Sequence, residues 1–261
     1  MQADLAQEVA IITGASRGIG QEIAVKFAAA NVTVVLAARS QDSLEEIAAT
    51  IRTQGGIALP VVTDVTQADE VKQLVSTTLK KFGRVDVLVN NAAANYVSSL
   101  VRSKDERWKE IFEVNVFGAY LCTKAVLPHM IRAKSGRIIN IASVAGKVGA
   151  AHNSAYSASK AGLIGFTKSI ALEVAKIGIT VNAICPWHVA TEMLYEAMKT
   201  RGAQFGKTAE EYTAQIVAQN PQKRLTTVEE VAALALFLTS PEARSINGQA
   251  INQCGGAVTA S

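Results

Sequence analysis

The chain has 261 residues, 49% of them hydrophobic, and a formal net charge of +4. This length is enough to bury one substantial core, so we expect a single domain over residues 1–261. No stretch is long and apolar enough to span a bilayer, and the small positive charge is spread without basic runs, so neither membrane nor nucleic-acid partners are expected.

The N-terminus and the cysteines predict the compartment. The first residues, MQADLAQEVAIITG, lack the basic stretch followed by an apolar one that marks a secretory signal. Cys122, Cys185 and Cys254 lie far apart and do not have metal-ligand spacing. We therefore expect reduced thiols in a cytoplasmic protein.

Strand-like and helix-like segments alternate along the chain. Apolar runs rich in β-branched residues lie at 8–13, 32–38, 56–65, 85–92, 137–143, 178–185 and 248–254. Segments with apolar residues three and four apart lie at 19–30, 42–55, 69–83, 104–133, 155–176 and 227–240. This alternation is typical of a parallel sheet covered on both faces. We predict an α/β fold: one Rossmann-like, doubly wound sheet of about seven strands with helices on both faces.

A glycine-rich turn, TGASRGIG, follows the first predicted strand. Gly14, Gly18 and Gly20 stand between that strand and a helix. Backbone N–H groups in such a turn, together with the helix N-terminus, bind the pyrophosphate of a dinucleotide. The alternative is an ordinary tight turn. The strand before it and the helix after it favour a cofactor site.

The end of the second predicted strand reads AARS and holds Arg39 where NAD sites usually have an acid. Arg17, inside the glycine turn, can reach the same space. Two guanidinium groups suit the 2′-phosphate that distinguishes NADP(H). We therefore predict that NADP(H) is preferred over NAD(H), the alternative being two solvated arginines.

A tyrosine and a lysine share one face of the helix predicted at 155–176. Tyr156 and Lys160 are four residues apart, within a single turn. A nearby ammonium favours the phenolate, so the pair suits proton transfer during alcohol–carbonyl interconversion. Ser143 ends a strand on the side where such sheets form sites, and its hydroxyl can hold the substrate oxygen. The pair alone is a weak signal; together with Ser143 and the glycine turn it predicts a catalytic site.

The region 190–225 is long and irregular and contains two short helical patterns, which favours a lid over the substrate. Its large apolar residues are Met193, Leu194, Tyr195, Met198, Phe205 and Tyr212. Helix packing or a subunit contact is the alternative. The cations in this region are Lys199, Arg201 and Lys207, and we expect them to form a solvated face rather than a site for an anionic carrier.

This ordered set of motifs resembles the short-chain dehydrogenase/reductase family, most of all its polyketide-type and 3-oxoacyl-type ketoreductases. The resemblance rests on TGASRGIG, NNAA at 90–93, EVNVFG around Asn115, YSASK at 156–160 and the stretch 186–191. It covers essentially the whole chain. It implies a homotetramer.

The resemblance also implies residue roles. Tyr156 is the acid/base, Lys160 holds the ribose and lowers the pKa of the tyrosine, Ser143 orients the carbonyl and Asn115 supports a water-linked proton relay. The implied cofactor-binding residues are Gly14, Ser16, Arg17, Gly18, Ile19, Gly20, Arg39, Ser40, Asp64, Val65, Asn91, Ala92, Tyr156, Lys160, Pro186, Val189 and Thr191.

The chain departs from the family pattern at two positions. Ala93 and Trp187 stand where the family has glycine, and a side chain at 187 restricts conformations with positive φ. We expect Trp187, His188, Met193 and His152 to line the substrate pocket. His129 and the other histidines lack partners at ligand spacing, which argues against a metal site.

The predicted function is the reversible, NADPH-dependent reduction of a ketone to a secondary alcohol. An NAD-dependent secondary alcohol dehydrogenase and a reductase of 3-oxoacyl carrier or CoA thioesters are the alternatives. A cofactor-binding scaffold without turnover is a third possibility. The complete set of Asn115, Ser143, Tyr156 and Lys160 argues against it.

Overall fold

The computed structural model describes residues 8–259, so residues 1–7, part of the stretch in which no secretory signal is expected, lie outside it. Seven strands form one sheet in the order β3-β2-β1-β4-β5-β6-β7, and every pairing is parallel. The strands are β1 Val9–Thr13, β2 Thr33–Ala38, β3 Ala58–Val62, β4 Val87–Asn90, β5 Gly136–Ile141, β6 Ile179–Pro186 and β7 Ala250–Gln253. The predicted α/β fold is confirmed.

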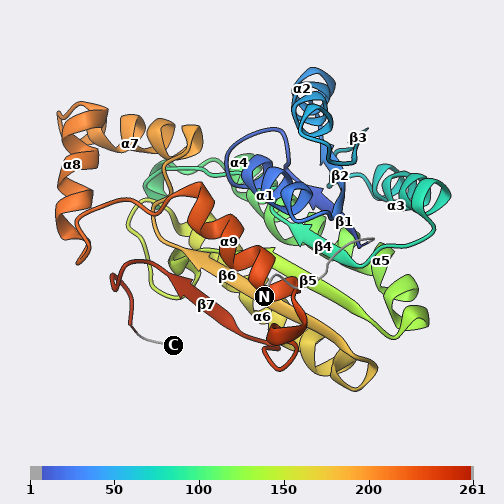
Figure 1. Cartoon of the computed structure of the whole chain (residues 1–261). Helices are drawn as coiled ribbons and strands as arrows, with labels where there is room; N and C mark the ends of the chain where they lie inside the picture. The colour runs from blue at the N-terminus through green and yellow to red at the C-terminus, as the bar shows by residue number, and fades with distance from the viewer. Residues whose placement is uncertain (1–7, 260–261) are drawn as a thin grey trace.

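Helices cover both faces of the sheet (Figure 1). One face carries α1 Gly18–Ala29, α2 Gln41–Thr53 and α9 Val228–Thr239. The other carries α3 Ala68–Phe82, α5 Gly118–Ala133 and α6 Ser154–Val174, and α4 Asp105–Phe112 packs against α6. Alternate strand residues point to opposite faces, so Ala10 and Ile12 belong to the first core while Val9 and Ile11 belong to the second. Among the described residues, no helix is both long and apolar enough to cross a membrane.

The helical stretch predicted at 104–133 is not continuous. A π-helix, Glu113–Phe117, separates α4 from α5 and contains Asn115. Such π-turns are often found at functional sites. Hydrophobic periodicity did not reveal the break, because the backbone stays helical on both sides of the π-turn.

The predicted insertion at 190–225 is confirmed as two helices, α7 Glu192–Gln204 and α8 Ala209–Gln219. They lie at one end of the sheet, beside each other and away from the helices on its faces (Figure 1). α7 follows the carboxyl end of β6, and because all strands are parallel, the carboxyl ends of the other strands lie at this end of the sheet too. β1 stands between β2 and β4, where the strand order reverses, and α/β proteins bind ligands at that point.

Candidate active site

A cleft of about 960 Å³ runs along the carboxyl ends of the strands, from the glycine turn to α7. The site residues predicted from the sequence line it, with three exceptions. Gly20 and Asn115 lie behind its wall, and His152 lies outside it. Residues that are separate in the sequence come together in the cleft: Ser143, which follows β5, lies beside Tyr156 of α6.

The glycine turn is shaped for a dinucleotide. Gly14 and Gly18 have φ of +63° and +58°, which side chains rarely adopt. A Cβ on Gly20 would lie 2.3 Å from the carbonyl oxygen of Gly14, so only glycine allows α1 to start this close to the turn. The first residues of α1 have no side-chain cap, which leaves N–H groups for an anion. The residues present therefore fit a pyrophosphate.

Asn91 holds this turn in place from the end of β4. Its Nδ2 donates to the carbonyl oxygens of Thr13 and Gly14, each at 3.0 Å. The Thr13 hydroxyl accepts from the backbone N–H groups of Asn91 and Ala92. Asn91 lines the cleft, but its amide is engaged in fixing the turn.

The two arginines near the second strand differ. Arg39 is exposed at the end of β2 and lines the cleft with Ser40, without a carboxylate partner among the described residues. Arg17 instead forms an ion pair with Glu192 at the start of α7, with Nη1 2.5 Å from Oε2. Arg39 is therefore the guanidinium free to meet a 2′-phosphate, and Arg17 links the glycine turn to the lid.

Tyr156 and Lys160 lie one turn apart on α6 at the bottom of the cleft. The Lys160 Nζ lies 5.6 Å from the centre of the Tyr156 ring and donates to the Ile141 carbonyl at 2.7 Å. Only 2% of Lys160 is exposed, and this burial lowers its pKa to about 8. The expected lowering of the Tyr156 pKa by Lys160 is not seen: burial raises this pKa, opposed by a hydrogen bond with Ser143 and by the charge of Arg201.

Ser143 follows β5 and its Oγ accepts from the backbone N–H of Ala145 at 3.1 Å. Asn115 is buried behind the cleft, with Oδ1 accepting from Ala94 N–H and Nδ2 donating to the Ser159 hydroxyl. Ser159 in turn donates to the Tyr156 carbonyl at 2.8 Å. Asn115 thus joins the start of α6 to the loop after β4, and the π-turn allows it to point inward.

The segment after β6 is fixed by its neighbours. Trp187 N–H donates to the Gln253 carbonyl, and Val189 forms a bridge with Thr226. Trp187 lines the cleft with His188, and the two rings meet edge to face at 4.5 Å. Positive φ among described non-glycine residues is confined to Asn31, Lys134, His152 and Lys223. Trp187 therefore replaces the family's glycine without strain.

Two sequence predictions differ from the structure. His152 is exposed and meets the lid residue Phe205 edge to face, because the neighbouring Asn153 takes the position facing the cleft. Arg201 is not part of a solvated face, since it is half-buried and lines the cleft. The spacing of Leu194, Met198 and Arg201 is the signal for this: i, i+4 and i+7 lie on one helical face. Lys199 is exposed, as predicted.

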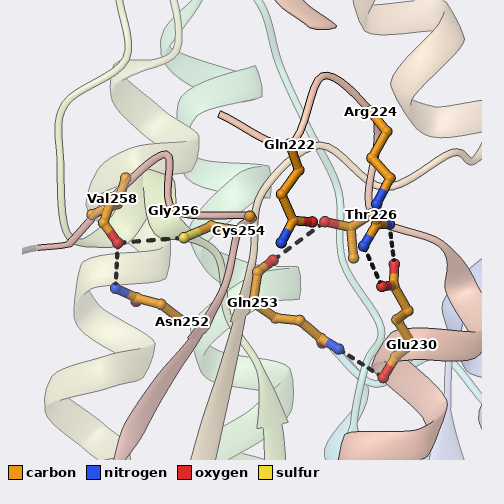
Figure 2. Close-up of a pocket in the computed structure, with 10 residues that line it drawn as sticks. Gln222, Arg224, Thr226, Glu230, Asn252, Gln253, Cys254, Gly256 and Val258 are labelled. Atoms are coloured by element: carbon orange, nitrogen blue, oxygen red, sulfur yellow. Dashed lines mark hydrogen bonds and ion pairs between the residues drawn. The ribbon is translucent and has the colours of Figure 1, made fainter. Parts of the chain in front are cut away.

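A second cavity, of about 390 Å³, lies between the end of β7 and the start of α9 (Figure 2). Arg224 donates to both carboxylate oxygens of Glu230, at 2.8 and 2.7 Å. Gln253 Nε2 donates to the Glu230 carbonyl, and the Thr226 hydroxyl donates to the Gln253 carbonyl. Its charged groups are thus paired with one another.

Within residues 8–259, no group of three or more His, Cys, Asp or Glu side chains is arranged to hold a metal ion.

Comparison with known proteins agrees with this geometry. A family model described as short chain dehydrogenase matches residues 8–202. A 3-oxoacyl-[acyl-carrier-protein] reductase of Synechocystis sp. is 45% identical, over 97% of this chain and 98% of its own length. A protein of the same description from Staphylococcus aureus is 37% identical, over 95% of this chain and 96% of its own.

Among solved structures, a variant of actinorhodin polyketide ketoreductase with NADPH superposes with a TM-score of 0.94. It is 38% identical in sequence, over 97% of this chain and 98% of its own.

Proposed function

This chain belongs to the short chain dehydrogenase family and interconverts ketones and secondary alcohols, and from this we propose that it is an NADPH-dependent ketone reductase. We propose Tyr156 as its proton donor. The observation that carries the proposal is the position of Tyr156, Ser143 and Lys160 in the same cleft as the glycine turn. The turn binds one end of a dinucleotide, and a carbonyl placed at the other end meets the hydroxyl groups of Ser143 and Tyr156.

The residues divide the work as follows. Ser143 holds the carbonyl oxygen, and Tyr156 gives that oxygen a proton. NADPH, when bound, supplies the hydride that reduces the carbonyl carbon. Burial raises the pKa of Tyr156, which keeps the phenol protonated and ready to donate at neutral pH.

Lys160 and Asn115 support this proton transfer. The Lys160 ammonium holds the cofactor ribose and favours the phenolate that remains after the proton has left. Asn115 fixes the first turns of α6 through Ser159 and supports the relay that returns a proton to Tyr156. Both are buried, so their geometry is set before the substrate binds.

The preference for NADP(H) is proposed from Arg39 and the absence of an acid at the end of β2. A ketoreductase of closely similar fold was solved with NADPH, which supports this choice. Reduction of 3-oxoacyl thioesters is the second candidate, because two similar proteins carry that description. We further propose one catalytic domain over residues 1–261, in a cytoplasmic protein, and a homotetramer, of which only the homotetramer is implied by the family resemblance.

A panel of ketones assayed with NADPH and with NADH tests the proposal, with chiral analysis of the alcohols formed. We expect ketone-dependent oxidation of NADPH with higher kcat/KM than with NADH. If no ketone is reduced with either cofactor, the proposed function is wrong.

Arg39→Asp tests the cofactor preference separately. The new carboxylate repels a 2′-phosphate and accepts hydrogen bonds from ribose hydroxyls, so we expect kcat/KM to fall at least tenfold with NADPH and to rise with NADH. Lys199→Met, which removes a charge from an exposed site on α7, is the control and leaves the ratio unchanged. A wild-type enzyme that already prefers NADH would refute the assignment.

A further inference from the structure

Arg201 is a cation that neither the proton transfer nor the cofactor preference uses. It lies on α7 on the same face as Leu194 and Met198, and these two side chains are buried. Its guanidinium is close enough to Tyr156 for each group to shift the pKa of the other. The positive charge therefore sits at the substrate end of the cleft rather than beside the glycine turn.

Asn153 fixes the orientation of this guanidinium. The side-chain amide of Asn153 is oriented with its oxygen towards Arg201, where it accepts from Nη2 at 3.2 Å. Its nitrogen points the other way and donates to Asn95 Oδ1 at 2.9 Å and to the Tyr96 carbonyl at 3.2 Å. Asn153 is itself 95% buried, being only 5% exposed. The arginine head is thus held in place by a rigid neutral group, which does not balance its charge.

The Arg201 Nε is buried and has no hydrogen-bond partner among the described residues. No carboxylate of that part of the chain forms an ion pair with Arg201 either. A half-buried guanidinium with a free donor is costly unless a ligand completes it.

The acidic residues that line the cleft are committed elsewhere. Glu192 pairs with Arg17, and Glu110 pairs with Arg107. Asp64 accepts from the backbone N–H and the hydroxyl of Thr66. The chain therefore leaves the positive charge of Arg201 open to the cleft.

His188, the other ionisable ring at this end, does not add a second cation. Burial, and secondarily the charge of Arg201, lower its pKa to about 4, so the ring is neutral at pH 7. Neutral His188 and Trp187 instead form an aromatic wall, in edge-to-face contact with each other.

We propose that Arg201 binds a carboxylate carried by the ketone itself, so that the preferred substrates are short oxo acids. This inference rests on the proposed ketone reduction. A planar carboxylate matches the guanidinium, which lines the cleft and whose fork donates two parallel hydrogen bonds. Arg201 bonds to Asn153, which caps α6 three residues before Tyr156, so an anionic group that it binds lies only a few bonds from the reacting carbonyl. The phosphate of a carrier lies too far from the carbonyl to meet this condition.

The test compares substrates that differ only in this charge. The rates with 3-oxobutanoate, its methyl ester and its N-acetylcysteamine thioester are measured with NADPH for wild type, Arg201→Met and Arg201→Lys. Arg201→Met lowers kcat/KM for the acid by about 10- to 100-fold, the value of a charged hydrogen bond, and changes the ester and thioester by less than about threefold. Arg201→Lys, which keeps the charge but loses the fork, lies between.

Lys199→Met is the matched control, because it removes one charge from the solvent side of the same helix. We expect it to leave kcat/KM for all three substrates within about twofold of wild type. This control distinguishes a direct contact between Arg201 and the carboxylate from long-range attraction of the anion by the positive charge of the helix. Equal losses for acid and ester in Arg201→Met would overturn the inference, since Arg201 would then act on Tyr156 or on the folding of α7.

A binding measurement decides the inference even if no ketone is turned over. Calorimetric titration of butanoate into the NADP⁺-loaded protein gives binding that Arg201→Met abolishes, while butanamide binds both proteins equally weakly. If butanoate binds wild type and Arg201→Met alike, the carboxylate site is refuted whatever the reaction. Failure of the proposed function, by contrast, appears as absent reduction of all ketones with butanoate binding intact.

Discussion

Arg201 and Arg224 line two different cavities and are held in opposite ways. Arg224, beside β7, donates two hydrogen bonds to the carboxylate of Glu230 (Figure 2). That carboxylate also accepts from the backbone N–H of Thr227. Arg201, in the cleft, has a neutral amide partner and an unpaired Nε. The same residue type serves the fold in one place and is left for a ligand in the other.

This difference distinguishes a charged group that stabilises the fold, which has a charged partner, from one that is available to a ligand, which does not. In the cavity beside β7, the pair with Arg224 lowers the pKa of Glu230 to about 2, so the carboxylate is ionised throughout the neutral range. In the cleft, burial disfavours the charged forms of Lys160 and His188, and no carboxylate of the described residues pairs with either of them. Perturbed, uncompensated groups mark the place where chemistry is done.

The largest expected difference between the cavities is in turnover. Tyr156→Phe removes the proton donor and lowers kcat for ketone reduction by at least about 100-fold, the usual contribution of a positioned acid. NADPH binding, followed by fluorescence titration, stays within about twofold. Glu230→Gln in the other cavity leaves kcat nearly unchanged. Full turnover by Tyr156→Phe would mean that the proton comes from elsewhere.

A smaller effect is expected in the pH dependence. Oxidation of a secondary alcohol needs the Tyr156 phenolate, and burial raises the pKa of this phenol above its usual 10. The oxidation rate therefore climbs by up to about tenfold per pH unit up to about pH 8, above which the Lys160 ammonium that favours the phenolate is itself lost, whereas reduction, which needs the phenol, stays level over pH 6–7. Rates in both directions across this range check the assignment, and Glu230→Gln does not move either profile. A level oxidation profile contradicts it.

The smallest expected effect is on stability. Arg224→Met breaks an exposed ion pair and lowers Tm by about 1–2 °C, whereas Arg201→Met removes an unpaired, half-buried charge and leaves Tm equal to or above wild type. Thermal unfolding of the two variants side by side makes the measurement. If Arg201→Met is the less stable protein, its guanidinium is part of the fold.

Much of this arrangement could be predicted from the sequence because it depends on local pattern. Continuous apolar runs such as 32–38 predict buried parallel strands, and Tyr156 and Lys160 have a fixed spacing on one helix. Glycines at 14, 18 and 20 can only be explained by a close turn. Each of these features is decided within a few residues of chain.

The remainder depends on contacts between distant segments. Arg201 faces Asn153 and Tyr156 only because α7 folds over the cleft. The spacing of Arg201 from Leu194 and Met198 marks one helical face but does not say what that face covers. His152 was expected in the pocket from its nearness to Tyr156 in the sequence. Its backbone, with φ of +61°, turns the ring outward to Phe205 instead. The π-turn at Asn115 is likewise invisible to periodicity.

Trp187 shows how such a site can diversify. Its backbone does not need glycine, its N–H is bonded to the strand beside it, and its indole forms part of the cleft wall. Exchange of the side chain at this position therefore alters the shape of the wall while the segment keeps its path. For an engineer seeking new ketone specificities, position 187 is the place to vary first, with apolar residues that keep its packing against the core beneath the cleft.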